Sequence, residues 1–557
     1  MNPPSARWRR RWAMLAAVLV GGLASVVGPA GPAAAANYVP ITGSGSTWSY
    51  NAFHAWTNNV AQYGMHIDYA RVGSTTGRSN FREGTVDFAA SDIPYGVKDG
   101  TSDDPPPPRG YVYMPDTAGG TTLMYNLKIG TSRVTNLRLS GTNVAKIFTG
   151  VLTKWNDPAI AADNPGLTLP AIKIVPVVRS DGSGSTAQFT QWMIATQGSY
   201  WTAYCGRVGR NPCTQTSAYP VLNGSGMVGQ NGDLGVSGYI SQAAATGTIG
   251  YVEYSYAIQA GFPVAKVLNT AGYYTEPTPG HVAVSLLAAQ INMDKNNRAA
   301  YLTQDLSHVY TNPDSRTYEL SSYSYMILPT TTDFGFTTAR GLTLGDFGNY
   351  VLCQGQAQVD SLGYSALPIN LVQAGFGQLQ TIPGAHVPTA TTDIIRSCNN
   401  PTFSTDGTNT LAKNDPHPPS CDKQGPTQCT TGTGGAQGST STSNGNGGNG
   451  ANGGNGANGT NPGGSASASA SAGAGADPNV ACDPDSGTCG GGANAANAAD
   501  QINGTPVNAA ADFHDGLGIA LMAVAVVLLI GLVLVPPLIA QSARNRQARR
   551  DGTGGVR

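Results

Sequence analysis

A change in composition near residue 400 limits what this chain can fold into. Residues 401–511 consist mainly of Gly, Asn, Ser, Ala and Thr, with runs such as GNGGNGANG at 445–453 and SASASAS at 465–471. A segment of this kind cannot bury enough apolar surface to offset the entropy that it loses on ordering. We therefore predict a disordered linker over 401–511 and confine the compact fold to residues 37–400.

The N-terminus has the pattern of a secretory signal peptide. Four arginines between residues 7 and 11 precede an apolar stretch from Ala13 to Val27, and a run of small residues ends at Ala36. This order predicts export, with a signal peptide over 1–36 that is cleaved between Ala36 and Asn37. An uncleaved membrane anchor is the alternative.

The C-terminus contains a second apolar run. Residues 516–540 contain no charged side chain and are numerous enough to cross a bilayer as one transmembrane helix. Arginines at 544, 546, 549 and 550 follow, and basic residues favour the cytoplasmic side. We predict a single-pass protein of the cell membrane, with an extracellular body and a basic cytoplasmic tail at 541–557. A sorted and cleaved tail is the alternative, although no sorting motif precedes the run.

All eight cysteines lie between the two apolar segments. An even number in an exported chain favours disulfides, and neither a paired C-x-x-C nor an H-E-x-x-H motif is present to favour a metal. The spacing favours local pairs at 205/213, 421/429 and 482/489, which leaves 353/398 as the fourth pair. We expect no metal and no cofactor.

The low charge of the chain excludes one class of partner. Charged residues make up 11% of the sequence and the formal net charge is −1. A protein that binds nucleic acid needs a basic domain or stripe, so we expect no nucleic acid as a partner. The same argument does not exclude a small anion that is bound by local dipoles.

Within residues 37–400, short apolar strands alternate with helical patterns. Strands are predicted at 67–72, 86–89, 172–178 and 249–254, and a helical stripe contains Trp48, Ala52, Ala55, Trp56 and Val60. Strands that alternate with helices predict an α/β fold with a largely parallel sheet.

Three turns rich in Gly, Ser and Thr stand where a predicted strand gives way to a helix. They are GSGSTW at 43–48, GSTTG at 73–77 and RSDGSGST at 179–186. Each presents backbone N–H groups and hydroxyls at a helix N-terminus, and such loops gather at the carboxyl ends of the strands. One such loop is usually a plain turn, but three together, one of which begins with Arg179, predict an anion site.

Catalysis by these loops is not favoured. None of them matches the P-loop motif G-x-x-x-x-G-K-[ST] or the nucleophile elbow G-x-S-x-G. A nucleophilic Ser183 needs a histidine partner, and the one histidine near the loops, His54, falls in a predicted helix. We expect a binding protein and not an enzyme.

A carboxylate beside this site predicts which anion binds. The segment TVDFAASD at 85–92 is predicted to be a buried strand that ends at Asp92. A carboxylate repels an anion unless the anion brings a proton, which phosphate does near neutral pH and sulfate does not. Asp92 is therefore predicted to select phosphate, and its alternative role is a helix N-cap or a solvated turn residue.

These motifs resemble those of the phosphate-binding proteins of the high-affinity phosphate ABC transporter. The likeness runs through most of 40–385, and its most specific parts are IFTGVLTKWNDPAIAADNPGLTLP at 147–170, VVRSDGSGSTAQF at 177–189 and GTIGYVEYSYA at 247–257. It implies two α/β lobes of the type II periplasmic-binding-protein kind, joined by hinge strands. Lobe 1 is expected over about 37–127 and 252–400, and lobe 2 over about 128–251.

The resemblance also implies which residues of the first lobe bind phosphate. Thr47 and Trp48 match ligands in the first loop, Trp48 through its backbone N–H, and Ser74 matches a ligand in the second loop. Asp92 matches the acid that accepts the phosphate proton.

In the third loop, Arg179 matches the cation of the family and Asp181 matches the carboxylate that holds it. The donors at the start of the following helix match Ser183, Gly184 and Ser185. Trp48 and Ser185 replace a usual Phe and a common Thr and keep their donors, whereas Thr76 replaces a small Gly and is expected to crowd the pocket.

The function that the resemblance implies is capture of inorganic phosphate outside the cytoplasm and its delivery to an ABC permease with its ATPase. A tethered phosphate sensor or scavenger without a permease is one alternative, and an exported phosphohydrolase is another. The long linker and the apolar C-terminal run differ from the free or lipid-anchored form that is usual in this family.

Overall fold

The computed structural model describes residues 38–97, 104–297 and 299–439. The predicted signal peptide, the part of the linker from 440 onward, the apolar run at 516–540, the basic tail and the cysteine pair 482/489 lie outside the described residues. None of the helices in the described ranges has the length and apolar character that a membrane crossing needs.

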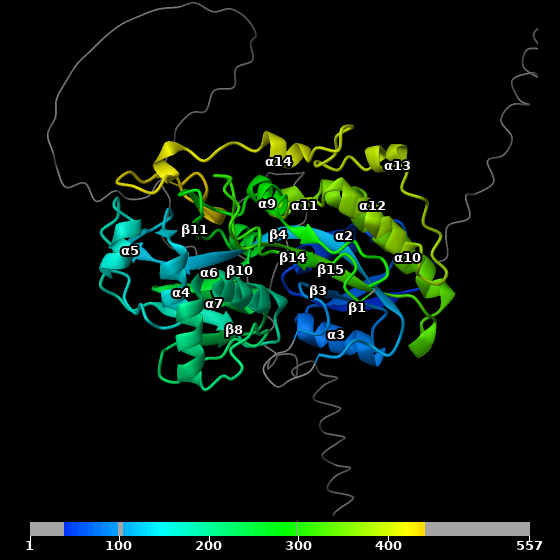
Figure 1. Ribbon diagram of the computed structural model, residues 1–557, viewed down its shortest axis with the longest axis horizontal. Coiled ribbons are helices and arrows are strands. Elements are labelled where there is room, and N and C mark those ends of the chain that lie inside the picture. The colour runs from blue at the N-terminus through cyan, green and yellow to red at the C-terminus, as the bar shows by residue number, and fades with distance from the viewer. Residues whose placement is uncertain (1–37, 98–103, 298, 440–557) are drawn as a thin grey trace, which may run out of the picture. The chain divides into compact units, whose positions relative to one another are not determined.

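One mixed sheet runs through the body, and its main path follows the order β2-β1-β3-β15-β4-β10-β8-β9 (Figure 1). These strands are β1 (Ile41–Gly45), β2 (Ile67–Ala70), β3 (Phe88–Ser91), β4 (Tyr111–Asn126), β8 (Val175–Arg179), β9 (Val228–Gln230), β10 (Thr248–Glu253) and β15 (Ser321–Pro329). The four strands predicted from the sequence correspond to β2, β3, β8 and β10, with ends that differ by a few residues.

The sheet is parallel toward its two ends and antiparallel in its middle. β1 runs parallel to β2 and β3, and β8 runs parallel to β9 and β10. In contrast, β15 pairs antiparallel with β3 and β4, and β4 pairs antiparallel with β10. The prediction of a largely parallel sheet is therefore wrong for the centre. There the long strand β4 passes from one lobe to the other, which produces the two-lobed α/β fold.

Lobe 1 packs its helices around an aromatic core beside β1, β2 and β3. The rings of Phe53 and Tyr69 stack with centroids 4.4 Å apart, and Phe88 and Phe347 contact the same cluster. Phe53 lies on the helix predicted from the apolar stripe. The helices of this lobe include α2 (Tyr50–Ala61), α3 (Ser74–Glu83), α10 (Thr338–Leu352), α11 (Val359–Leu362), α12 (Ile369–Leu379) and α13 (Thr392–Ser397).

Lobe 2 is built on β8, β9 and β10 and includes chain beyond the predicted boundary at residue 251. β11 (Val264–Leu268) pairs with β4 and with β7 (Arg138–Leu139), so the chain returns to lobe 1 only after β11. The assignment of 252–268 to lobe 1 is thereby corrected. The helices of lobe 2 are α4 (Gly141–Phe148), α5 (Pro158–Asp163), α6 (Gly184–Val208), α7 (Gly232–Ser241) and α8 (Tyr254–Gln259).

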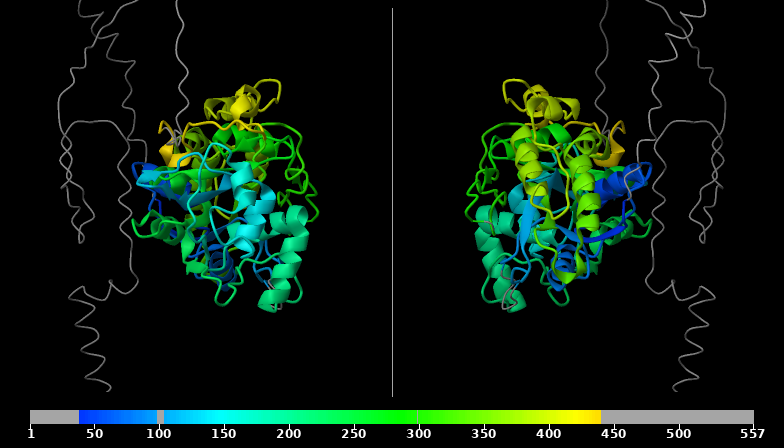
Figure 2. Two further views of the ribbon diagram at one scale, coloured as in Figure 1. Left: turned by 90° about the vertical axis from the view of Figure 1, so that its left-hand side faces the viewer. Right: turned by 90° about the vertical axis from the view of Figure 1, so that its right-hand side faces the viewer.

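Residues 401–439, which we call the C-terminal strap, pack against the body, so the predicted start of the linker at 401 is wrong. Within the strap, α14 (Thr410–Asn414) contacts α9 (Pro279–Leu286), and Ala412 and Thr433 are buried. The yellow end of the chain follows one edge of the body in all three views (Figures 1 and 2). Much of this attachment uses backbone groups, since Arg138 Nη1 donates to the carbonyls of Cys421 and Thr427.

Three of the four predicted disulfides are present in the described residues. They join Cys205 to Cys213, Cys353 to Cys398 and Cys421 to Cys429. No cysteine of the described part of the chain is free.

Candidate functional site

The three predicted loops come together where the two lobes meet. In lobe 1, the first loop leads from β1 to α2, and the second follows β2 and forms the start of α3. In lobe 2, the third loop joins β8 to α6. Contacts cross the boundary directly: the Thr75 N–H donates to the Gly182 carbonyl at 3.0 Å, and Gln188 Nε2 donates to the Asp92 carbonyl at 3.0 Å. The loops are therefore parts of one site.

Two glycines allow this close approach. Gly45 has a φ of 145°, and a Cβ placed there would lie 2.0 Å from the Ala90 carbonyl oxygen. Gly184 begins α6, and a Cβ there would lie 2.6 Å from Asp92 Oδ2 and 2.7 Å from Ser74 Oγ. A side chain at either position has no room, so the glycines of these loops determine how closely strand, helix and opposite lobe can pack.

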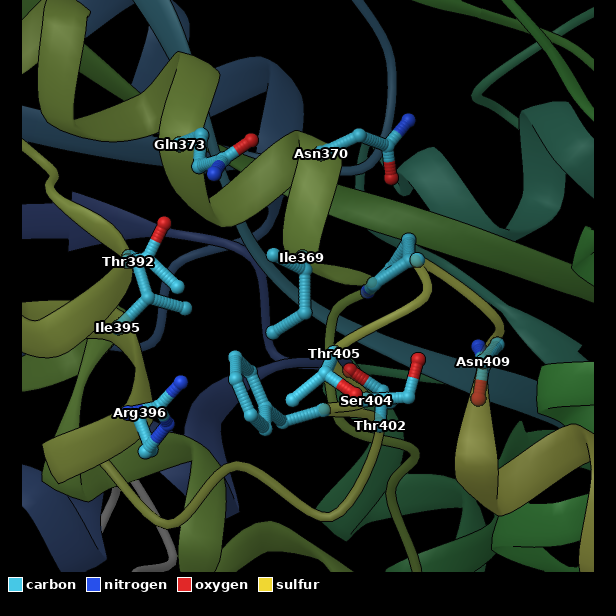
Figure 3. Close-up of a pocket in the computed structure, with 13 residues that line it drawn as sticks. Ile369, Asn370, Gln373, Thr392, Ile395, Arg396, Thr402, Ser404, Thr405 and Asn409 are labelled. Carbon is cyan, nitrogen blue, oxygen red and sulfur yellow. The ribbon is translucent and has the colours of Figure 1, made fainter.

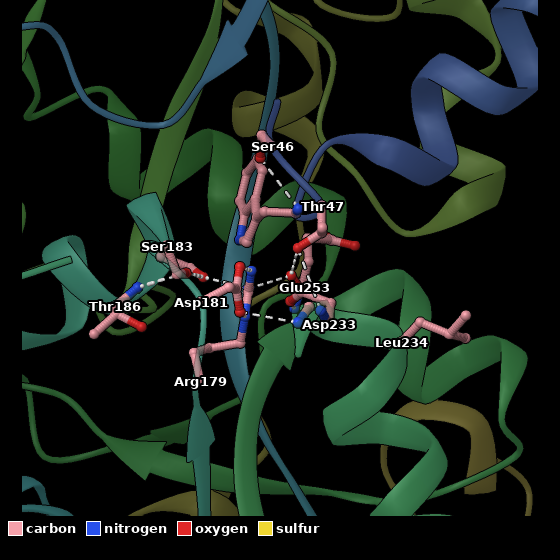
Figure 4. A network of polar contacts seen from close by, with 12 residues as sticks. Ser46, Thr47, Arg179, Asp181, Ser183, Thr186, Asp233, Leu234 and Glu253 are labelled. Carbon is pink, nitrogen blue, oxygen red and sulfur yellow. Dashed lines mark hydrogen bonds and ion pairs between the residues drawn. The ribbon is translucent and has the colours of Figure 1, made fainter. Parts of the chain in front are cut away.

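Arg179 is the cation of the site and is 1% exposed (Figure 4). Its Nε and Nη2 donate to the two carboxylate oxygens of Asp181 at 2.7 and 2.5 Å, and its Nη1 donates to Ser185 Oγ at 3.2 Å and to Asp233 Oδ2 at 2.5 Å. Burial opposes the charge, but Asp233 and Asp181 outweigh it and raise the pKa of Arg179 above its usual value. Burial likewise opposes the charge of Asp181, but Arg179 holds the pKa of that carboxyl below its usual value.

Asp92 lies at the end of β3 between the first two loops. Ser46 Oγ donates to its Oδ1 at 2.7 Å, and Ser74 Oγ donates to its Oδ2 at 3.2 Å. No cation of the described residues bonds to it directly, and burial raises the pKa of Asp92 to about 6 despite the bond from Ser46. The structure thus places Asp92 at the site with two hydroxyl donors.

The other predicted residues of the first loop lie at the same place but already have partners. Thr47 Oγ1 donates to Asp233 Oδ2 at 2.5 Å. The Trp48 N–H donates to Ser46 Oγ at 3.1 Å, and its indole N–H donates to Thr121 Oγ1 at 3.1 Å. The ring of Trp48 is buried, so this residue also anchors the loop to the core.

The start of α6 supplies the remaining predicted donors. Ser183 caps the helix by accepting from the Thr186 N–H at 3.1 Å, and its Oγ lies 2.7 Å from Ser185 Oγ. Thr76 is exposed on α3, so the expectation that it crowds the pocket is wrong.

Sequence reasoning missed two side chains of the site, Ser46 and Asp233. Ser46 stands inside the first loop motif but was not assigned a role. Asp233 lies in the first turn of α7, where the segment GQNGD at 229–233 repeats the strand, glycine and helix order of the other loops. It contains no Ser or Thr, which is why it was not grouped with them.

The chemistry of this arrangement is that of anion binding. Hydroxyls, helix-terminal N–H groups and one guanidinium supply donors, and the carboxylates accept. No group of His, Cys, Asp or Glu that could hold a metal ion is found among the residues that the structure describes.

A separate surface pocket of about 360 Å³ lies between α12, α13 and the strap (Figure 3). Asn370, Gln373, Ser404 and Asn409 contribute polar groups to it, and Arg396 contributes a charge. The Arg396 side chain is 56% exposed, and none of the predicted site residues lines the pocket.

Comparisons with known proteins cover the region of the site. A family model described as a PBP superfamily domain matches residues 30–354, a range that contains every predicted site residue. The phosphate-binding protein PstS of Xylella fastidiosa (strain Temecula1) is 33% identical over 337 residues, which are 60% of this chain and 83% of that protein. The phosphate-binding protein PstS of Pasteurella multocida (strain Pm70) is 30% identical over 343 residues, or 61% of this chain and 90% of that protein.

A solved high-affinity periplasmic phosphate-binding protein (PfluDING), bound with phosphate at pH 8.5, is more distant. It is 18% identical, it covers 63% of this chain and all of its own, and the TM-score is 0.47. That likeness is too low to support an argument about function.

Proposed function

This chain belongs to the phosphate-binding proteins of the PBP superfamily, and we therefore propose that it binds inorganic phosphate between its two lobes. Proteins of this family are substrate-binding proteins and not enzymes. An exported phosphohydrolase is accordingly not supported.

One observation supports the proposal most strongly. Arg179 is fully buried yet fixed by a two-pronged ion pair with Asp181, and its remaining Nη1 faces the point where Thr47, Ser185 and Asp233 meet. A cation that is oriented in advance and has hydroxyls beside it is suited to a tetrahedral oxyanion, because the guanidinium itself need not be reoriented on binding.

The donors divide between the lobes. In lobe 2, Arg179 provides the charge, Asp181 positions it, and the start of α6 provides the donors of Ser183, Gly184 and Ser185. In lobe 1, Thr47, Trp48 and Ser74 complete the donor set. The Trp48 N–H takes part by exchanging Ser46 Oγ for a phosphate oxygen, since Ser46 is its partner at 3.1 Å.

Asp92 provides the selection. An ionised carboxylate accepts a hydrogen bond from a P–OH group but repels the unprotonated oxygens of sulfate, and burial strengthens both effects. The partners of Asp92 include the hydroxyls of Ser46, Ser74 and Ser324, and no cation of the described residues is bonded to it. Its negative charge is therefore not neutralised by an ion pair, and the preference for a protonated anion is kept.

Delivery to an ABC permease and its ATPase is the cellular role that we propose, from the outer side of the cell membrane. The apolar run at 516–540 would serve as the single membrane span and the segment from 440 as the tether. Phosphate uptake by cells that lack the chain, with and without a copy that ends before 516, tests this role. Unchanged uptake in the cells without the chain would instead favour a sensor or scavenger.

Calorimetric titration of the full-length chain with phosphate and with sulfate tests the binding itself. We expect one phosphate per chain and no measurable heat from sulfate. Asp92→Asn should narrow the difference between the two anions, and Asp68→Asn, which changes an exposed carboxylate of the same lobe, should leave it unchanged. Equal affinities for the two anions in the unmodified chain would contradict the role of Asp92.

A further inference from the structure

We infer that Asp233 is a second specificity-determining carboxylate of the phosphate site, and that it couples phosphate binding to the uptake of a proton. This inference rests on the proposed function. Asp233 is completely buried, and its Oδ2 accepts from Arg179 Nη1 and from Thr47 Oγ1, both at 2.5 Å. These two donors are among those proposed for phosphate, so an anion that uses them lies against Asp233.

The position of Asp233 is fixed by its other contacts. Its Oδ1 accepts from the Glu253 N–H at 2.9 Å, and its own N–H donates to Thr47 Oγ1 at 3.2 Å (Figure 4). The first contact holds the carboxylate to the end of β10, and the second joins α7 of lobe 2 to the first loop of lobe 1. A turn of Asp233 Oδ2 away from the site would break its bonds from Thr47 Oγ1 of lobe 1 and Arg179 Nη1 of lobe 2.

The surroundings of Asp233 contain more acid than base. Arg179 is the cation bonded to it, and this guanidinium is already shared with Asp181. The titratable and charged groups that face Asp233 are Arg179 from β8, Asp181 from the loop after β8, Asp92 from the end of β3, Glu253 from the end of β10, Tyr256 from α8 and Tyr364 from the segment after α11. Burial raises the pKa of Glu253 well above its usual value, which weakens the negative charge that this residue adds beside Asp233.

Two carboxylates at the site require two protons. Dibasic phosphate has one P–OH group, which donates to Asp92 or to Asp233 but not to both. The carboxylate left over then faces an unprotonated phosphate oxygen in a buried site, where like charges repel strongly. A second proton, on phosphate or on a carboxylate, removes this repulsion by forming a second hydrogen bond.

The proton must come from solvent. The pKa of about 6 places Asp92 in its ionised form at about pH 8, and phosphate is mainly dibasic there, so neither partner brings the second proton. The complex then forms from the protein, one dibasic phosphate and one proton. The affinity should fall by about tenfold for each pH unit in this range, as linkage requires when one proton is taken up.

Calorimetry of the full-length chain with inorganic phosphate at about pH 8, in two buffers of different protonation enthalpy, counts the protons. We expect an uptake of about one proton per phosphate. Binding without proton uptake would overturn this inference and leave the proposed function intact, whereas the absence of phosphate binding would overturn both.

Substitutions test whether the proton uptake depends on both Asp92 and Asp233. Asp233→Asn should lower the uptake to nearly zero and remove the dependence of affinity on pH. Asp92→Asn should also lower the proton uptake to nearly zero, because Asp233 is then the one carboxylate left to accept the P–OH group. This second variant tests the inference if Asp233→Asn does not fold. Asp163→Asn, which changes a buried carboxylate of the same lobe bonded to the Ser140 N–H, should keep the full uptake. Persistence of the full uptake in Asp233→Asn or in Asp92→Asn would contradict the inference.

Discussion

The two lobes bring different chemistry to one site. Lobe 2 provides a guanidinium that is paired in advance, since Arg179 is bonded to both Asp181 and Asp233 within the same lobe. Lobe 1 provides hydroxyls and Asp92, which is held by Ser46 and Ser74 without a bonded cation. The difference fits the proposal that the guanidinium of lobe 2 attracts an anion, while Asp92 of lobe 1 tests for a proton without a cation bonded to it.

The pKa values of the two carboxyl groups differ in line with this division. In lobe 2, Arg179 holds the pKa of Asp181 below its usual value although burial acts in the opposite direction. In lobe 1, burial raises the pKa of Asp92 to about 6. Burial acts in the same direction on both carboxyls, but the pKa of Asp181 is lowered because Arg179 is bonded to it, whereas the described residues give Asp92 no bonded cation.

Removal of the cation of lobe 2 should have the largest effect. Arg179→Ala leaves Asp181 and Asp233 buried without their partner, which costs about 3–5 kcal/mol, and phosphate binding should weaken by more than about 1,000-fold. Calorimetry measures the affinity and urea unfolding measures the stability.

Arg340→Ala is the matched control, because Arg340 forms an ion pair with Asp87 but its side chain is 43% exposed. It should leave phosphate affinity unchanged. An affinity of Arg179→Ala within about tenfold of that of the unmodified chain would show that the attraction does not reside in lobe 2.

The dependence of stability on pH should show the unpaired state of Asp92. Its pKa rises from 3.8 in the unfolded chain to about 6 in the folded chain, so the folded state binds the proton more tightly. The stability from this group is fully present below about pH 4 and is lost as the pH rises through about 6, by up to about 3 kcal/mol. Asp181 should act with the opposite sign, because its pKa is lowered in the folded chain: its contribution is lost as the pH falls.

Urea unfolding of the phosphate-free chain at several pH values checks this contrast. Asp92→Asn should remove the loss of stability between about pH 4 and 6, whereas Asp181→Asn should lower the stability at neutral pH. The same slope in the unmodified chain and in Asp92→Asn would argue against a buried, unpaired Asp92.

The smallest of these effects should come from the contact between the lobes. A Cβ in Gly184→Ala would lie 2.6 Å from Asp92 Oδ2 and 2.7 Å from Ser74 Oγ, so it opposes closure of lobe 2 onto lobe 1. Phosphate binding should weaken by about 30-fold, or about 2 kcal/mol, the cost of an overpacked contact. Gly198→Ala, on the same helix, has nothing within 4 Å of its new Cβ and should leave the affinity unchanged.

That these loops come together at one place was largely predictable from the sequence, because each loop is a local feature. Each loop joins a strand to a helix within a few residues, so the pattern of Gly, Ser and Thr around Arg179 already indicated donors at helix starts. Asp92 could be recognised for the same reason, since it ends a short buried strand. Asp233 could not, because its role depends on Arg179 and Thr47, and no local pattern reports contacts across 54 or 186 positions of the chain.

The C-terminal strap was not predictable for a different reason. Composition identifies segments that cannot form an apolar core, and residues 401–439 resemble the linker in this respect. The strap is instead attached through hydrogen bonds to its backbone, such as those from Arg138 to Cys421 and Thr427, and through a disulfide. The antiparallel centre of the sheet was not predicted either, because the order and direction of strands depend on pairings between distant segments.

The strap also determines where tension on the chain would enter the body. Close to its end, the Thr433 N–H donates to the Thr135 carbonyl at 3.0 Å, and the Gly435 N–H donates to the Phe262 carbonyl at 2.9 Å. A pull at residue 439 is therefore borne first by hydrogen bonds to lobe 2. The disulfide between Cys421 and Cys429 then limits how much strap can be peeled away before the load reaches Arg138. Mechanical force would thus reach the lobe that holds Arg179 before it reaches lobe 1, to which Thr402 at the start of the strap is bonded through the Leu367 carbonyl.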